Sequence, residues 1–272
     1  MSIIISANKA KQMVENDAAI CIDVRTKVDG FKDGEAAYDD HHIENAIYLH
    51  AKRDLSGEGS FLPNAESLAT TLGEHGIDET TPVIIYDEGN NRAASRAWVA
   101  LTYIGHEQVY LLNGGLDAWR TVGGTLTAER PEHEPKTYRT NVRDSLLAHI
   151  DDVKEKLHND ASVLIDSRAY DRYSGKVEPK YKKAGHIPGA KNFHAKLVQA
   201  EDGKWKEKDE LEKHFATLEK YDEVIVSCGS GNSACLNVVA LKEAGFENVR
   251  LFAGGFSEWI SDDTNKVATE EE

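Results

Sequence analysis

One segment in the second half of the sequence combines residue types suited to chemistry on sulfur. Cys228 ends an apolar run, a helical pattern opens at Ala234, and the residues between them are Gly229, Ser230, Gly231, Asn232 and Ser233. A helix N-terminus offers partial positive charge and free N–H groups, which favour a thiolate and can hold a second anionic atom on the sulfur. Glycines let such a loop curl so that its N–H groups point inward. The segment therefore predicts a nucleophilic cysteine that forms and stabilises an anionic persulfide.

The other two cysteines, Cys21 and Cys235, lack such surroundings. Three unevenly spaced cysteines do not provide a disulfide framework or a zinc site. Cys21 lies inside an apolar run, and Cys235 lies within the helical pattern that follows the glycine-rich loop. Both are interpreted as small core residues, so Cys228 is the expected catalytic residue.

The elements that must position this loop are short strands and the helices between them. Apolar, β-branched runs at 20–22, 83–85, 163–165 and 224–226 predict strands that are buried on both faces, as in a parallel sheet. The clearest helical pattern covers 234–244, and Gly245 stands where a left-handed C-cap is expected. Ligands of such sheets bind beyond the carboxyl ends of the strands, which directs attention to 86–92 and 227–233.

The sequence repeats itself once. Residues Gly105, Glu107, Val109, Leu111, Gly114, Gly115 and Trp119 recur 140 positions later as Gly245, Glu247, Val249, Leu251, Gly254, Gly255 and Trp259. Upstream the offset drifts to between 141 and 144, which small loop insertions explain. A repeat this long indicates a duplicated domain, since solenoid units span only ~20–50 residues. The polar, proline-containing stretch 125–143 is typical of a connection, so we expect two α/β domains, 1–134 and 135–272.

Three motifs together resemble a rhodanese domain. They are the strand–Cys–Gly–Ser–Gly–x–Ser–Ala–helix segment, the upstream run Gly185-His186-Ile187-Pro188-Gly189-Ala190, and the downstream run Gly254-Gly255-Phe256-x-x-Trp259. The similarity spans nearly the whole chain and implies two tandem rhodanese-like domains, each a mainly parallel sheet flanked by helices. A loop cysteine in the second half alone resembles the two-domain thiosulfate and 3-mercaptopyruvate sulfurtransferases.

In the first half, Asp87 aligns with Cys228. The loop that begins at Asp87 and ends at Arg92 is also one residue longer than its counterpart, because the offset falls from 141 before it to 140 after it. We therefore expect the first domain to be catalytically inactive and to act as a scaffold.

The resemblance also implies which residues bind the sulfur donor. Gly229-Ser230-Gly231 is similar to the loop of 3-mercaptopyruvate enzymes, whereas Asn232-Ser233 departs from their Val-Thr, so thiosulfate stays open as the donor. Arg172 matches the family arginine that binds the anionic group of the donor, and a guanidinium fork suits a carboxylate or thiosulfonate. A second family arginine has no match, and of Lys180, Lys182 and Lys183 we place Lys180 first. The family's proton relay would fall to Ser230 and His42. The expected substrate-binding residues are thus Arg172, Lys180, Gly229, Ser230, Gly231, Asn232 and Ser233.

The expected reaction passes sulfur from a small anionic donor to cyanide or a thiol acceptor, which could be a low-molecular thiol or thioredoxin. It requires no cofactor and no metal, because cysteine alone can accept and release sulfur in a ping-pong cycle. Two alternatives remain. One is a non-catalytic module that binds a protein or senses oxidants through Cys228. The other is a cysteine phosphatase, which is disfavoured because Ala234 stands where the arginine of a phosphate loop would be.

Bulk composition narrows the setting of this chemistry. The formal net charge of −15 over 272 residues opposes binding to nucleic acid or to anionic lipid. No apolar run approaches the ~20 residues that cross a bilayer, and the first residues lack the pattern of a secretory signal. We therefore expect a cytoplasmic protein.

The pairs Asp23-x-Arg25 and Asp166-x-Arg168 recur in both halves and are interpreted as structural ion pairs.

Overall fold

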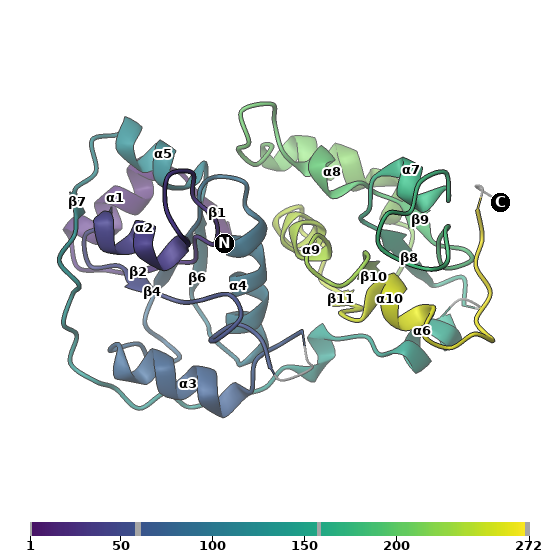
Figure 1. The fold of residues 1–272 in the computed structure, drawn as a ribbon, viewed down its shortest axis with the longest axis horizontal. Helices are drawn as coiled ribbons and strands as arrows, with labels where there is room; N and C mark the ends of the chain where they lie inside the picture. Colours follow the sequence, from purple (N-terminus) through teal and green to yellow (C-terminus); the bar gives the residue numbers. More distant parts are fainter. Residues whose placement is uncertain (1, 58–60, 157–158, 270–272) are drawn as a thin grey trace. The chain divides into compact units, whose positions relative to one another are not determined.

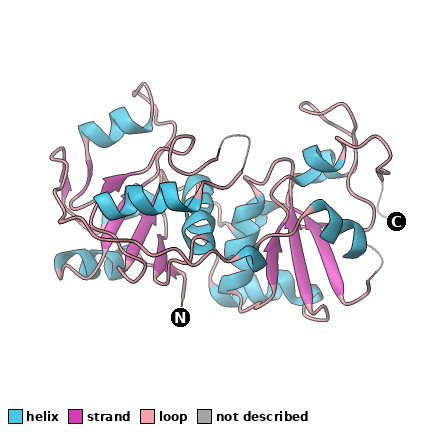
Figure 2. Cartoon of the chain, turned by 90° about the horizontal axis from the view of Figure 1, so that it is seen from below, coloured by secondary structure: helices cyan, strands magenta, loops and turns pink. Residues whose placement is uncertain are grey.

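The computed structural model describes residues 2–57, 61–156 and 159–269. They form two compact units. Unit 1 comprises Met1–Arg143 together with Glu201–Trp205, and unit 2 comprises Asp144–Ala200 together with Lys206–Glu272. Helices flank the strands of each sheet (Figure 2).

The division between the units lies later in the chain than the expected boundary after residue 134. Residues 136–143 belong to unit 1 because their backbone is hydrogen-bonded there. Lys136 N donates to Gly73 O at 2.9 Å, and Asn141 N donates to Ile104 O at 2.9 Å. These pairings bridge segments far apart in the sequence, so composition alone did not reveal them.

Unit 1 is built on a five-stranded parallel sheet (Figure 1). In spatial order its strands are β1 (Ile4–Ile5), β6 (Val109–Leu112), β5 (Val83–Tyr86), β2 (Ile20–Asp23) and β4 (Ile47–Tyr48). A small antiparallel pair joins β3 (His42–Ile43) to β7 (Leu126–Thr127). The helices are α1 (Ala7–Glu15), α2 (Gly34–Asp40), α3 (Ala65–Glu74), α4 (Arg92–Tyr103) and α5 (Gly115–Thr121).

Unit 2 has a four-stranded parallel sheet. In spatial order its strands are β11 (Val249–Leu251), β10 (Glu223–Ser227), β8 (Ser162–Asp166) and β9 (Lys191–Asn192). The helices are α6 (Ile150–Lys156), α7 (Tyr170–Tyr173), α8 (Lys208–Phe215), α9 (Ala234–Glu243) and α10 (Gly255–Trp259), with 3₁₀ turns at Asp144–Leu146, Ala195–Val198 and Ala216–Leu218. The four strands expected from the sequence are all present, and Gly245 has the expected left-handed conformation with φ +94°.

Four strands of the first sheet have the same order as the four strands of the second, which confirms that the sequence repeat is a repeat of the fold. The order β6-β5-β2-β4 in unit 1 matches β11-β10-β8-β9 in unit 2. The correspondence extends to the edges: His42 pairs with Thr127 in unit 1, and His186 pairs with Ala268 in unit 2. Each histidine stacks on a tyrosine with ring centroids 3.8 Å apart, His42 on Tyr38 and His186 on Tyr173.

Polar side chains define the starts of several helices of unit 1. Ser6, Asp33 and Asn64 each accept a hydrogen bond from a backbone N–H in the first turn of α1, α2 and α3, respectively. Such caps satisfy donors that the helix itself leaves unpaired. The helices that follow the two aligned loops differ, because neither Asn91 before α4 nor Ser233 before α9 forms a side-chain cap. In α4 the side chains of Asn90 and Asp87 accept from Arg92 N and Ala94 N instead, whereas Ser233 leaves the start of α9 without a side-chain cap of its own.

A buried histidine of unit 1 gives the fold a predictable pH dependence. His106 Nε2 donates to Thr81 O at 2.8 Å, and Nδ1 lies 3.1 Å from the Tyr138 hydroxyl. Burial lowers the pKa of His106 from 6.5 to about 4. The unfolded chain therefore takes up a proton before the folded chain does, and stability is lost as the pH falls below 6.5. Urea unfolding should show a free energy about 2 kcal/mol lower at pH 5 than at pH 8 from this group, and His106→Gln should remove that part of the difference. An unchanged pH dependence in the variant would contradict the assignment.

Candidate active site

Cys228 lies at the point where the central strand of unit 2 gives way to a helix. Strand β10 ends at Ser227, and α9 begins at Ala234. The side chain of Cys228 is buried, and the residue is 2% exposed. Gly231 takes the left-handed conformation with φ +84°, which turns the loop toward the helix at a position that favours glycine. The cysteine thus occupies the carboxyl end of a central parallel strand, where ligands of such sheets bind.

The cysteine loop is closed from its outer side by the start of α10. Phe256 N donates to Cys228 O at 2.8 Å, and Ser257 N donates to Gly229 O at 3.0 Å. Gly255 permits this approach, because a Cβ atom there would lie 2.6 Å from Cys228 O. Unit 1 has the same arrangement, in which a Cβ atom on Gly115 would lie 2.4 Å from Asp87 O. The repeated Gly-Gly pair is therefore a packing requirement of this loop.

The loop residues expected to bind the donor differ in their exposure. Gly229 and Gly231 are buried, Ser230 and Asn232 are exposed, and Ser233 is half-buried. The second cysteine of the region, Cys235, is fully buried and its Sγ donates to Gly231 O at 3.5 Å. Its position inside the first turn of α9 fits the interpretation as a core residue.

Arg172, the expected anion-binding residue, lies on the short helix α7 and is held by an acidic partner. Its Nη2 donates to both carboxylate oxygens of Glu178, at 2.8 and 2.9 Å. The Arg172 side chain is 21% exposed, whereas that of Glu178 is 3% exposed. Arg172 Nε is buried and has no hydrogen-bond partner among the residues that the structure describes. Part of the guanidinium therefore remains available to a further acceptor.

Sequence reasoning missed Glu178, which links three of the residues that it discussed separately. Besides Arg172, Glu178 accepts from Arg168 Nη1 at 3.2 Å and from Lys180 N at 3.0 Å. Lys180 itself is exposed. Arg168 is also paired with Asp166 at 2.6 Å, so the buried ion pair of β8 and the donor-binding arginine belong to one network. An acidic residue between Arg172 and three lysines was the signal in the sequence that could have revealed it.

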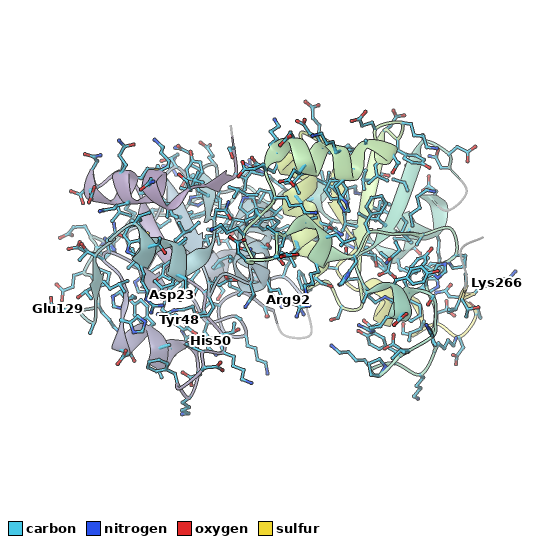
Figure 3. All side chains as sticks on the ribbon, turned by 90° about the horizontal axis from the view of Figure 1, so that it is seen from above. Asp23, Tyr48, His50, Arg92, Glu129 and Lys266 are labelled. Carbon is cyan, nitrogen blue, oxygen red and sulfur yellow. The ribbon has the colours of Figure 1, made fainter. Side chains whose placement is uncertain are left out.

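The corresponding ion pair of unit 1 is extended differently, because Arg25 Nε also lies 3.5 Å from Glu88 Oε1. Asp23 and Arg25 are paired at 2.8 Å with side chains that are fully buried. Asp23 lies in register with Tyr48 of the neighbouring strand, and Figure 3 shows the two side chains close together. Arg25 Nη1 is buried without a hydrogen-bond partner among the described residues, whereas the equivalent atom of Arg168 is bonded to Glu178.

A tyrosine that sequence reasoning did not consider reaches the cysteine loop from the Arg172 side. The Tyr181 hydroxyl is 2.8 Å from the position that a Cβ atom on Gly229 would take. Its ring lies 5.5 Å from Arg172 Cζ and packs edge-on against Phe256, with centroids 6.1 Å apart. Tyr181 therefore bridges the expected anion-binding arginine and the residue next to Cys228. It also explains why position 229 has no side chain.

The structure does not support the relay expected of Ser230 and His42. His42 is fully buried, with Nδ1 at 2.7 Å from Tyr38 O and Nε2 at 3.1 Å from Glu129 O. Both ring nitrogens are thus engaged by backbone carbonyls within unit 1. The stacking on Tyr38, repeated by His186 on Tyr173, marks His42 as part of the repeated framework.

In unit 1 the place of the cysteine is taken by a carboxylate that fills the loop. Asp87 is 2% exposed, and it accepts hydrogen bonds from the backbone N–H groups of Gly89 at 2.8 Å, Asn91 at 3.1 Å and Ala94 at 3.2 Å. Burial raises the pKa of Asp87, and these N–H groups act in the opposite direction. The loop of unit 1 is therefore still an anion-binding turn, and its own side chain occupies it.

Residues 201–205 cover the same loop of unit 1. Asn91 Nδ2 donates to Gly203 O at 2.8 Å, and Trp205 N donates to Asn113 Oδ1 at 2.9 Å. Trp205 is 2% exposed. The Asp87 loop thus serves as a packing surface for a distant segment of the chain.

The described residues contain neither a metal-binding cluster nor a membrane-spanning helix. In the ranges 2–57, 61–156 and 159–269, no group of three His, Cys, Asp or Glu side chains is arranged to hold a metal ion. None of the helices in these ranges has the length and apolar character needed to cross a membrane.

Comparison with known proteins agrees with this geometry. The family model described as "Rhodanese-like domain" matches residues 6–121 and 149–262, one match in each half. A protein of Pseudomonas aeruginosa named "Probable 3-mercaptopyruvate sulfurtransferase" is 35% identical over 271 residues, covering 96% of this chain and 95% of the relative. A protein of Mycobacterium tuberculosis named "Putative thiosulfate sulfurtransferase SseB" is 35% identical over 276 residues, covering 97% and 96%.

Solved structures show the same fold. SseA from Escherichia coli, described with the rhodanese fold of 3-mercaptopyruvate sulfotransferases, superimposes with a TM-score of 0.81 and is 28% identical. The match covers 94% of this chain and 99% of SseA. The expected architecture of two rhodanese-like domains is thereby confirmed. With a match in each half and relatives similar over nearly its whole length, the chain belongs to the rhodanese family.

Proposed function

We propose that this protein is a sulfurtransferase in which Cys228 accepts a sulfur atom from a small anionic donor and passes it on from a persulfide. The observation that carries the proposal is the placement of Cys228, buried at the end of β10 before an uncapped α9, in a loop held by α10. The sulfurtransferase names of relatives with 35% identity support the same reaction class.

In the first half-reaction the Cys228 thiolate attacks the outer sulfur of the donor. A new S–S bond forms, and the bond between that sulfur and the rest of the donor breaks, with its electron pair leaving on pyruvate enolate or on sulfite. Backbone N–H groups of the loop 229–233 and of the start of α9 then stabilise the anionic persulfide. In the second half-reaction cyanide or a thiol attacks the terminal sulfur and regenerates the thiolate.

The donor's carboxylate or sulfonate would be bound by the part of Arg172 that Glu178 leaves available. The Arg172 side chain is 21% exposed and binds Glu178 through Nη2, so the donor anion would approach the exposed part of the guanidinium. We place 3-mercaptopyruvate first because of Gly229-Ser230-Gly231, with thiosulfate as the second donor. Relatives at equal identity carry both names, so they do not separate the two donors.

The direct test is to incubate the purified protein with either donor and to analyse it by intact-mass and peptide mass spectrometry. The proposal expects one added sulfur atom on Cys228, its loss on addition of cyanide, and equivalent release of thiocyanate. No added sulfur with either donor would overturn it. For the second half-reaction, the acceptors to compare are cyanide, a low-molecular thiol and reduced thioredoxin. The cytoplasmic location expected from the sequence stays a prediction.

Arg172→Ala is expected to lower kcat/KM for the donor about 10- to 100-fold, mainly through KM, because a charge-assisted hydrogen bond contributes about 1.5–3 kcal/mol. Lys180→Ala should lower it no more than about fivefold, since an exposed cation contributes about 1 kcal/mol or less. Lys183→Ala is the matched control, because Lys183 pairs with the exposed Asp263 at 3.0 Å. Steady-state kinetics of the three variants checks this order, and an unchanged kcat/KM in Arg172→Ala would remove Arg172 from the site.

A further inference from the structure

The Tyr181 hydroxyl is placed beside the cysteine loop without a hydrogen-bond partner. None of the residues that the structure describes donates to it or accepts from it, while its ring packs against the core of unit 2, with contacts to Arg172 and Phe256. Other tyrosines of the chain are anchored: Tyr173 donates to Ala190 O at 2.7 Å, and Tyr38 donates to Ala46 O at 2.6 Å. Tyr181 itself is half-buried.

The position of Tyr181 defines what a donor molecule would meet. Tyr181 lies beside both groups that the donor is proposed to engage, because its hydroxyl is close to Gly229, the residue after Cys228, and its ring faces the Arg172 guanidinium at 5.5 Å. The edge-on contact with Phe256 orients the ring, and Phe256 in turn is hydrogen-bonded to the Cys228 carbonyl. The hydroxyl is therefore fixed relative to the cysteine loop.

We infer that Tyr181 is a catalytic residue that transfers a proton during sulfur transfer from 3-mercaptopyruvate. The inference rests on the proposed function and adds a donor-specific step to it. Cleavage of the carbon–sulfur bond leaves its electron pair on carbon as the enolate of pyruvate, and this carbon needs a proton before pyruvate can leave. A phenol is a much stronger acid than a ketone's α-carbon, so the transfer from a tyrosine hydroxyl is favourable.

The protons balance over the half-reaction. The Cys228 thiolate attacks the thiol sulfur of 3-mercaptopyruvate, and the S–S bond forms as the C–S bond breaks. The enolate carbon takes the proton of the Tyr181 hydroxyl, and the resulting tyrosinate takes the proton of the terminal persulfide S–H. The products are pyruvate, an anionic persulfide on Cys228 and a restored phenol. The proton that began on the donor sulfur thus ends on the methyl carbon.

Thiosulfate provides a natural contrast because its transfer moves no proton. The thiolate attacks the outer sulfur, the S–S bond of thiosulfate breaks, and sulfite leaves with the electron pair. A proton-transferring tyrosine is needed for one donor and not for the other. A tyrosine that only shapes the pocket would affect both donors alike.

The test is Tyr181→Phe, which keeps the ring beside Gly229 and Arg172 but removes the hydroxyl. Persulfide formation on Cys228 is followed with each donor in single-turnover experiments, with pyruvate and sulfite quantified. We expect the rate with 3-mercaptopyruvate to fall about 10²-fold and the rate with thiosulfate to change less than about twofold. Tyr170→Phe, at an exposed position of the neighbouring helix, is the matched control and should leave both rates unchanged.

Further measurements distinguish a lost proton transfer from a disturbed loop and from a failure of the proposed function. An unchanged rate of Cys228 alkylation by iodoacetamide in Tyr181→Phe shows that the loop has kept its structure. A solvent deuterium isotope effect with 3-mercaptopyruvate that persists undiminished in the variant, or equal losses with both donors, would overturn the inference. If the wild-type protein forms no persulfide with either donor, the proposed function itself fails. If the wild-type protein is active and Tyr181→Phe has the same rates, only the inference about Tyr181 fails.

Discussion

Cys228→Ser is expected to abolish sulfur transfer, with kcat/KM lower by at least about 10³-fold with either donor. A serine hydroxyl stays protonated at neutral pH and cannot form a persulfide, whereas the loop and the start of α9 can stabilise a charged sulfur. Cys228 is 2% exposed, and the other two cysteines are buried elsewhere, Cys21 in β2 and Cys235 in α9. Thiocyanate release with cyanide and the mass of the donor-treated protein both measure this prediction.

Cys235→Ala is the matched control for that variant. Cys235 is also buried and lies in the next helix, but its Sγ faces the Gly231 carbonyl and the chemistry does not use it. We expect Cys235→Ala to keep kcat/KM within about threefold of the wild type. Its free energy of unfolding should fall by an amount typical of small core truncations. Full activity in Cys228→Ser, or its loss in Cys235→Ala with the fold intact, would contradict the assignment of the nucleophile.

The sequence alone predicted those features that depend on neighbouring residues. Strand positions follow from short apolar runs, the C-cap at Gly245 from a glycine after a helical pattern, and the reactive loop from a cysteine before two glycines. The repeat then supplied long-range information, because two copies of one pattern predict two copies of one sheet. The shared strand order in the two units is the direct structural counterpart of the 140-residue offset.

Features that depend on contacts between distant segments could not be predicted in this way. Residues 136–143 join unit 1 through backbone hydrogen bonds and through side-chain contacts to distant segments, such as that of Tyr138 with His106, which the local composition does not reveal. The lone acidic residue Glu178 between Arg172 and three lysines indicates a charge partner, but only the structure shows that it is buried against both Arg168 and Arg172. Tyr181 reaches Gly229 across nearly 50 residues of sequence, and only the three-dimensional structure shows that its hydroxyl faces the cysteine loop.

Asp87→Ala is expected to destabilise unit 1 by about 3–5 kcal/mol. The carboxylate accepts the N–H groups of Gly89, Asn91 and Ala94 in a buried loop, and each N–H left without an acceptor costs roughly 1–3 kcal/mol, partly recovered by water. The same loop carries the hydrogen bond from Asn91 to Gly203, so the cover formed by residues 201–205 should loosen as well. Urea unfolding measures the first effect, and amide hydrogen exchange at Gly203 and Trp205 measures the second.

Two further experiments distinguish the effect of losing the negative charge from the effect of losing the Asp87 side chain. Asp87→Asn keeps one oxygen acceptor, but its amide NH₂ faces a backbone N–H that the carboxylate accepted. Its free energy of unfolding should therefore lie between those of Asp87→Ala and the wild type. Formate supplies the missing carboxylate, and it should raise the unfolding temperature of Asp87→Ala more than that of the wild-type protein. Equal shifts in both proteins would mean that the loop of unit 1 does not bind an anion. A selective rescue would mean that both halves of the chain kept one anion-binding turn, which unit 1 fills with its own carboxylate and unit 2 reserves for sulfur.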